Sequence, residues 1–221
     1  DASVGMLLGV AFVGLVFYWV LQQYNAVSMT NAGLKADMVR LADVNNMSSE
    51  EFVRTFSGLF QGPDWMVERA YARRPFTDTQ DLRRSFQEAL FAATPEEQAQ
   101  LISSYPDLGA MSVAIGEAGE DSQSDQSVLG LTRLAEAEHQ ELAALTKAYR
   151  DRFGFTLIMA VRDQQNIDQL LRNGWERLNN SPTQEHAAAL IEIAKIATHR
   201  FDRLVADANP IQSARTRHLD T

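Results

Sequence analysis

The chain has 221 residues, a formal net charge of −9 and no cysteine. The lack of thiols excludes disulfides, thiolate catalysis and Cys-ligated metals, and it fits a reducing compartment. The acidic balance, which no basic cluster interrupts, argues against binding to nucleic acid and against adhesion to an anionic lipid surface. A chain of this length fits one domain and an additional anchor.

An apolar run of eighteen uncharged residues, from Val4 to Leu21, dominates the N-terminal region. As a helix it would measure roughly 27 Å, close to the hydrocarbon thickness of a bilayer. A signal peptide would begin with basic residues, but the first is Lys35. A buried core helix usually keeps a polar stripe, and this run has none. We therefore expect a transmembrane helix over residues 1–27, with Tyr18 and Trp19 in an interfacial aromatic belt.

The residues that flank this run indicate its orientation. Lys35 and Arg40 follow it and only Asp1 precedes it, which favours a soluble domain on the cytoplasmic side, or on the matrix or stromal side of an organelle. Small residues within the run would let other transmembrane subunits pack closely against it, namely Gly5, Gly9 and Gly14. We expect a single-pass membrane protein in contact with lipid and such subunits. Because the chain starts with Asp rather than Met, we also expect a processed or truncated product.

The remainder of the chain carries repeated signals for helix starts. Ser48 with Glu51 forms a capping box, in which a hydroxyl and a carboxylate satisfy amides at the first turn. The segments 94–97 and 181–184 repeat the pattern with Pro at the first helical position. The segment 77–80 is a fourth candidate. These signals predict an all-α protein.

Apolar residues recur at intervals of three and four after these caps. Examples are Phe52, Phe56, Leu59 and Phe60, then Leu82, Phe86 and Leu90, then Leu190, Ile193, Ile196, Ala197, Phe201 and Leu204. We expect a linker or helix extension over 28–47, an all-helical domain over 48–207 and a flexible tail over 208–221. The small, acidic stretch 116–126 is expected to form a loop or the start of a helix.

The histidines show no pattern that is typical of a metal site. His139, His186, His199 and His218 do not lie four residues apart on one helix face, so a zinc site is not expected. Each is interpreted as a surface or capping residue, and no metal is predicted.

A series of local strings resembles one known family. The string from Gly62 to Ala70 (GPDWMVERA) is followed by RRPF at 73–76, YPDL at 105–108, SQSDQ at 122–126 and AYRDRFGF at 148–155. Their order and spacing resemble the OHCU decarboxylases, which act on 2-oxo-4-hydroxy-4-carboxy-5-ureidoimidazoline and complete the conversion of urate to (S)-allantoin. The resemblance covers roughly residues 48–205. It implies a cofactor-free, all-helical and often dimeric protein.

The resemblance also implies a site, with departures from the family pattern. Tyr105 stands where the family has its catalytic histidine, and Asp125 stands where it has the assisting glutamate. Substrate-binding positions are implied at Pro106, Ser122, Gln126, Leu157, Ile158 and Arg162. Two further departures are Thr156 in place of a proline and Thr146 in place of an asparagine.

The replacement of histidine by Tyr105 bears directly on the chemistry. Loss of CO2 leaves a carbanion or enolate that a positioned donor must protonate. An imidazole titrates near 6.5, whereas a phenol titrates near 10 and is the weaker acid by roughly 3.5 units. Asp125 is one methylene shorter than Glu, and a shift of about 1 Å in an active site can reduce the rate on the order of a hundredfold.

These observations support three functional hypotheses. The first is a membrane-anchored domain that has lost decarboxylase activity and serves as a structural or accessory subunit of a membrane complex. The second is an active, cofactor-free OHCU decarboxylase that gives (S)-allantoin, with Tyr105 or a water that it positions as the proton donor, and with Gln126 and Arg162 binding the substrate. The third is a pocket that binds a ureide without turnover.

Overall fold

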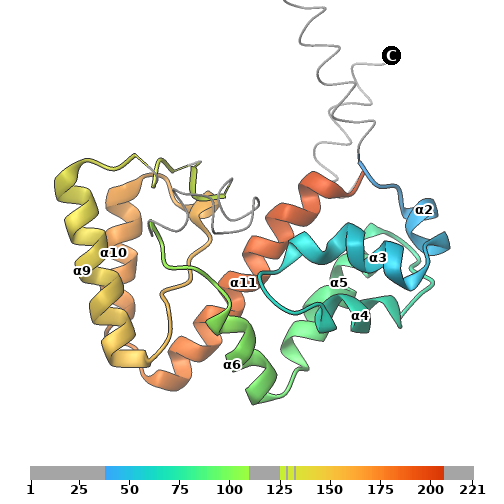
Figure 1. The fold of residues 1–221 in the computed structure, drawn as a ribbon, viewed down its shortest axis with the longest axis horizontal. Helices are drawn as coiled ribbons and strands as arrows, with labels where there is room; N and C mark the ends of the chain where they lie inside the picture. The colour runs from blue at the N-terminus through green and yellow to red at the C-terminus, as the bar shows by residue number, and fades with distance from the viewer. Residues whose placement is uncertain (1–37, 110–124, 128, 132, 207–221) are drawn as a thin grey trace, which may run out of the picture. The chain divides into compact units, whose positions relative to one another are not determined.

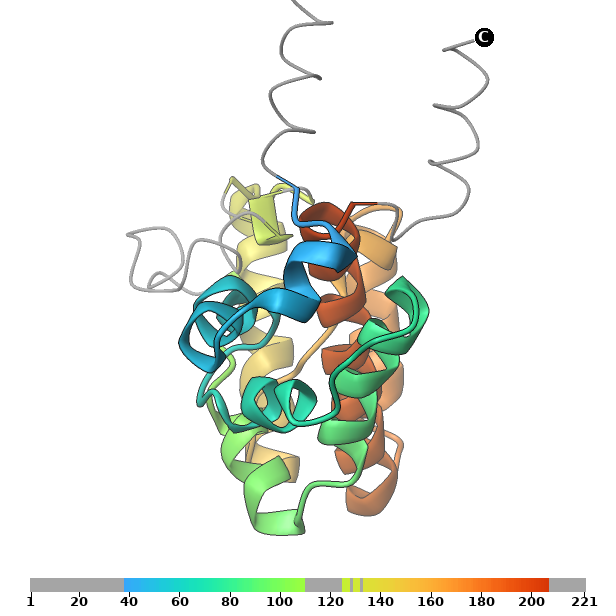
Figure 2. The same cartoon turned by 90° about the vertical axis from the view of Figure 1, so that its right-hand side faces the viewer.

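The computed structural model describes residues 38–109, 125–127, 129–131 and 133–206. Their regular elements are helices (Figures 1 and 2), as the capping pattern predicted. In chain order they are α2 (Leu41–Asn46), α3 (Ser49–Phe56), η1 (Ser57–Leu59), α4 (Trp65–Tyr71), α5 (Thr79–Phe91), α6 (Pro95–Ser103), α9 (Glu136–Phe153), η2 (Val161–Asp163), α10 (Ile167–Arg177) and α11 (Pro182–Leu204).

The helix starts confirm the predicted caps. At α3 the Glu51 amide donates to Ser48 Oγ over 3.2 Å, and the Ser48 amide donates back to Glu51 Oε2 over 2.8 Å. The same reciprocal capping begins α6 and α11. At α5 the cap is Asp78, whose carboxylate accepts from the Asp81 amide over 2.7 Å. The fourth candidate segment therefore does start a helix.

An aromatic core holds α3, α5 and α11 together. Phe52 and Phe56 of α3 have ring centroids 4.6 Å apart, and Phe56 lies 5.2 Å from Phe86 of α5. Phe86 in turn meets Phe201 of α11 edge-on at 6.3 Å. All four side chains are buried, so the apolar spacing of the sequence corresponds to the inner faces of three helices.

A second core lies between α9 and α10. The two helices approach closely at Gly174, where an added Cβ would lie 2.5 Å from Leu145 Cδ2. The helix α9 ends at Gly154, which adopts the left-handed conformation (φ 80°) that favours glycine. The chain then runs back along this core as the segment 157–161, whose side chains are buried.

The helix α11 separates these two groups. Figure 1 shows it between the α9–α10 pair and the group formed by α2 to α5, and Figure 2 shows α9 and α10 beyond α11 when α2 and α3 face the viewer. It packs on α5, η1 and α6. The site described below lies on the face of α11 that is turned toward the segment 157–162.

The expected anchor, residues 1–27, lies outside the described residues, as do its Gly5, Gly9, Gly14, Tyr18 and Trp19. Within the described ranges, no helix is both long enough and apolar enough to cross a bilayer. The described helices belong to a compact unit that starts at Arg40, and Val44 of α2 contributes to its core. The domain limits at 27, 47 and 207 stay predictions.

Candidate active site

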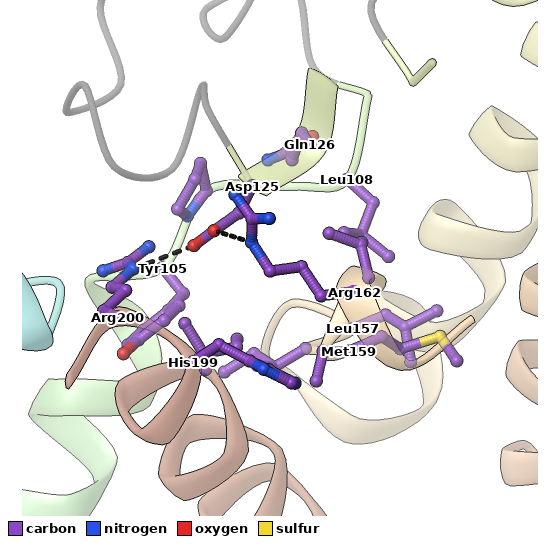
Figure 3. A pocket seen from close by; sticks show the side chains of 14 residues that line it. Tyr105, Leu108, Asp125, Gln126, Leu157, Met159, Arg162, His199 and Arg200 are labelled. Atoms are coloured by element: carbon purple, nitrogen blue, oxygen red, sulfur yellow. Dashed lines mark hydrogen bonds and ion pairs between the residues drawn. The ribbon is translucent and has the colours of Figure 1, made fainter. Parts of the chain in front are cut away.

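An open pocket lies between α11 and three segments that converge on it, and its empty space, open solvent included, is about 480 Å³. One segment follows α6, the second is the short helical turn 125–127, and the third runs from residue 157 into η2. Figure 3 shows the side chains around the pocket. They belong to Tyr105, Pro106, Leu108, Asp125, Gln126, Leu157, Ile158, Met159, Ala160, Val161, Arg162, Ile196, His199 and Arg200.

The segment after α6 is fixed from two directions. Asp107 Oδ1 accepts hydrogen bonds from the Thr156 hydroxyl and from Arg150, whose Nη2 is 2.5 Å away. The Gly109 amide donates to Gln126 Oε1 over 2.8 Å, which joins this segment to the turn that carries Asp125. These contacts hold Tyr105 and Pro106 at the wall of the pocket.

Three arginines surround the carboxylate of Asp125. Arg162 Nε donates to Oδ1 over 2.7 Å and Arg200 Nε donates to Oδ2 over 2.8 Å, on either side of the carboxylate (Figure 3). Arg203 adds a longer bond of 3.3 Å to Oδ1. Burial alone would raise the pKa of Asp125, but the hydrogen bonds and charges of the arginines outweigh it and lower the pKa below 3.8. Asp125 is therefore a carboxylate at neutral pH.

Tyr105 is a buried phenol whose hydroxyl is already engaged. Its oxygen accepts a hydrogen bond from the Gln61 amide over 3.3 Å. Burial raises the pKa of Tyr105 to about 12, although the charge of Arg200 and the Gln61 amide act in the opposite direction. At neutral pH Tyr105 is an uncharged phenol and a poor proton donor.

The segment 157–162 is held from both sides by side chains of α10 and α11. The Ala160 amide donates to Glu192 Oε2 over 2.6 Å, and Arg177 Nη1 donates to the Ile158 carbonyl over 2.6 Å. Leu157 and Ile158 are buried. The segment thus presents a rigid apolar wall that ends at the Arg162 guanidinium.

His199 completes the pocket on the α11 side. Its Nε2 lies 2.5 Å from Asp163 Oδ1 of η2, and its side chain is 34% exposed. His199 is thus partly exposed at the surface, as the sequence indicated, and it also lines the pocket, which the sequence did not indicate. The helical spacing of His199 from Ile196 and Arg200 places all three on one face, but only the fold shows that this face borders the pocket.

The structure brings most of the predicted site residues together. The pocket is lined by Tyr105, Pro106, Asp125, Gln126, Leu157, Ile158 and Arg162. Ser122 lies outside the described residues. Sequence reasoning missed Leu108, Met159, Ala160, Val161, Ile196, His199 and Arg200. Among the side chains that the structure describes, no group of His, Asp and Glu is arranged to hold a metal ion.

Fold and pocket together define an all-helical protein with a pocket of mixed apolar and guanidinium lining. The OHCU decarboxylase family profile matches residues 45–202. The chain is 32% identical over 161 residues to a 2-oxo-4-hydroxy-4-carboxy-5-ureidoimidazoline decarboxylase from Haloferax volcanii, covering 73% of this chain and 93% of that protein. The chain therefore belongs to the OHCU decarboxylase family.

Other relatives are longer proteins. The chain is 35% identical over 183 residues to a uric acid degradation bifunctional protein from Bacillus sp. strain TB-90, covering 83% of this chain but only 35% of that protein. It thus spans about a third of that relative. Among solved structures, an (S)-allantoin synthase matches with a TM-score of 0.58 and 22% identity, over 76% of this chain and 54% of the other. At that identity the match supports the fold alone.

Proposed function

We propose that this chain decarboxylates OHCU and releases (S)-allantoin, as its relatives' names suggest. One observation carries the proposal: the Arg162 guanidinium, fixed by Asp125, ends an apolar wall in the pocket that the family's site positions line. A guanidinium is a planar fork of donors that suits the carboxylate and ureido groups of this substrate. The sequence alone favoured the hypothesis of a subunit without activity. That hypothesis is now the second candidate.

The polar residues of the pocket are suited to binding the substrate, and the apolar residues are suited to excluding water from it. Arg162 and the Gln126 amide are suited to the polar groups of the substrate, while Leu157 and Ile158 shield the reacting carbon from water. Asp125 holds Arg162 in place rather than acting as a base, because the three arginines that surround it lower its pKa and so make it a weak acceptor of protons. Positioned cations of this kind also stabilise the negative charge that develops as CO2 leaves.

The second candidate is a decarboxylase-derived subunit of a membrane complex without turnover. It is supported by the neutral, buried phenol of Tyr105, with its pKa of about 12, at the family's histidine position. Related proposals are an anchor at residues 1–27 that contacts lipid and other membrane subunits, a soluble domain on the cytoplasmic, matrix or stromal side, and a homodimer. Washing membranes with alkaline carbonate tests the anchor, because an anchored chain stays with the membrane and a peripheral one is released.

A stereochemical assay separates the two candidates. Fresh OHCU decays without enzyme to racemic allantoin, so an enantiomeric excess measured by circular dichroism reports turnover by the protein. The proposed function predicts an excess of (S)-allantoin with the unmodified chain. The second candidate predicts the buffer rate and racemic product, with activity created only when Tyr105→His and Asp125→Glu restore the family pattern. If both the unmodified chain and the double variant bound OHCU without accelerating its decay, a ureide-binding site would be favoured instead.

A further inference from the structure

An imidazole lines the pocket on its α11 side, at a position that no sequence motif marks. His199 lies on α11, and Figure 3 shows it at the α11 wall, away from Asp125 and Gln126. Its Nε2 is 2.5 Å from the Asp163 carboxylate of η2. Because an ionised carboxylate only accepts, Nε2 carries the hydrogen of this bond. The second ring nitrogen, Nδ1, is then the one that can exchange a proton.

The two residues at the family's acid/base positions are poorly suited to supply a proton at neutral pH. Burial raises the pKa of Tyr105 to about 12, and its oxygen serves as the acceptor for the Gln61 amide. Asp125 accepts from Arg162, Arg200 and Arg203, so it holds no proton to give. His199 is the imidazole among the described residues that line the pocket, and imidazole is the side chain whose ordinary titration lies nearest to neutrality.

We propose that His199 is the catalytic proton donor of this chain, an inference that rests on the proposed function. The bond between the substrate's carboxylate and its ring carbon breaks, CO2 departs, and the electron pair stays on that carbon as a carbanion or enolate. The protonated imidazole donates its Nδ1 proton to the carbon and becomes neutral. It regains a proton from water, to which its side chain is 34% exposed. One proton is consumed and one CO2 is released, so the step balances.

Asp163 is a positioning residue in this scheme. Its carboxylate accepts from Nε2 and so fixes the orientation of the imidazole ring. Other charged groups lie near His199: Asp125, Arg162 and Arg200 line the same pocket, and Lys195 and Arg203 lie one turn away on α11.

The test compares single variants in the stereochemical assay with fresh OHCU. A general acid contributes about 10²–10⁴-fold, so His199→Gln, whose amide can still reach Asp163, is expected to lower kcat at least about a hundredfold with little change in KM. His199→Asn is expected to do the same. His186→Gln is the matched control, because His186 lies on the same helix outside the pocket and contacts Gln98. It should keep the wild-type rate.

The pH profile supplies a readout that a structural role would not change. In the unmodified chain, kcat is expected to fall as the pH rises through the titration of an imidazole. This fall in kcat with pH should be absent in His199→Gln. Asp163→Asn, which removes the acceptor that orients the ring, is expected to lower kcat. Tyr105→Phe is expected to reduce kcat less than about tenfold, through loss of its bond to Gln61.

Two results would overturn this inference while leaving the proposed function intact. One is a wild-type rate and pH profile in both His199 variants. The other is loss of activity in Tyr105→Phe that exceeds the loss in His199→Gln. An unmodified chain that produces only racemic allantoin at the buffer rate would overturn the proposed function and this inference with it. Thermal melts of each variant confirm that the comparison is made on folded protein.

Discussion

Arg162 Nε donates to Asp125 Oδ1 over 2.7 Å, and this bond joins two segments that lie far apart in the sequence. Asp125 comes from the short turn 125–127 and Arg162 from η2. The bond closes the pocket on one side and at the same time sets the direction of the guanidinium. Function and stability therefore depend on the same carboxylate.

Asp125→Asn is expected to destabilise the protein. The substitution leaves the Arg200 guanidinium, whose side chain is only 4% exposed, without its charged acceptor. Breaking a buried ion pair from one side costs about 3–5 kcal/mol. We expect a loss of this size in the free energy of unfolding, measured by urea titration at neutral pH.

Asp151→Asn provides the matched comparison for that measurement. Asp151 pairs with Lys147 on the surface of α9, where the two side chains are 62% and 77% exposed. An exposed pair of this kind contributes about 0–1 kcal/mol. Equal losses of unfolding free energy in Asp125→Asn and Asp151→Asn would show that the charges of the arginines do not need the Asp125 carboxylate to balance them.

Arg162→Gln is expected to weaken substrate binding. A hydrogen bond to a charged group contributes about 1.5–3 kcal/mol, which corresponds to roughly a 10- to 150-fold rise in KM for OHCU. Arg162→Lys should bind the substrate better than Arg162→Gln but less well than wild type, because a lysine keeps the charge but not the planar fork of donors. Arg172→Gln, an exposed position on α10, is the control and should leave KM unchanged. An unchanged KM in Arg162→Gln would remove Arg162 from the binding site.

Glu185 is expected to make stability depend on pH in the acid range. Its buried carboxylate accepts from Asn180, from two nitrogens of Arg177 and from the Tyr149 hydroxyl. Burial would raise the pKa of Glu185, but these donors outweigh it and lower the pKa below 4.5. A lowered pKa means that the stabilisation is complete above about 4.5 and is lost as the pH falls through the folded value.

The comparison of Glu185→Gln with wild type over a range of pH tests this. At about pH 7 the free energy of unfolding of Glu185→Gln should be lower by about 3–5 kcal/mol. The reason is that Arg177, whose side chain is only 14% exposed, keeps its charge but loses the Glu185 carboxylate. The difference should narrow as the pH falls below about 4.5. Glu176→Gln, exposed on the neighbouring helix α10, should follow wild type throughout. If the difference in unfolding free energy between Glu185→Gln and wild type stayed constant down to about pH 3, the role of Glu185 would be contradicted.

Gly174→Ala is expected to destabilise the contact between α9 and α10. Its new Cβ would lie 2.5 Å from Leu145 Cδ2, and Leu145 is fully buried. Overpacking of this kind costs about 1–3 kcal/mol, which exceeds the roughly 1 kcal/mol that alanine gains over glycine in a helix. A double-mutant cycle with Leu145→Ala should show a favourable coupling of at least about 1 kcal/mol. Additive effects would mean that the two side chains do not collide.

The helix starts could be predicted from the sequence because their signals are local. The cap at Ser48 depends on Glu51, three residues away, so the pattern contains both partners. The apolar spacing that predicted the faces of α3, α5 and α11 is local in the same sense. The exact first residue of α5 required the structure, because Thr77 and Asp78 are both good caps and only the geometry selects Asp78.

The sequence predicted part of the site. The residues that it did not predict have partners that lie far away in the sequence. The residues that the family strings carry, such as Tyr105 and Arg162, were identified and lie in the pocket. His199 was missed because its partner Asp163 is 36 positions away and reaches it only through the packing of η2 on α11. Arg200 was missed for the same reason, since its bond to Asp125 spans 75 positions. Such contacts leave no periodic trace in the sequence.

The enantiomeric composition of allantoin formed from fresh OHCU by the unmodified, purified chain tests the central claim most directly. We predict an excess of (S)-allantoin that grows with protein concentration and that falls in Arg162→Gln when OHCU is below its KM. Racemic product at every protein concentration, formed at the rate of the buffer control, would contradict the account.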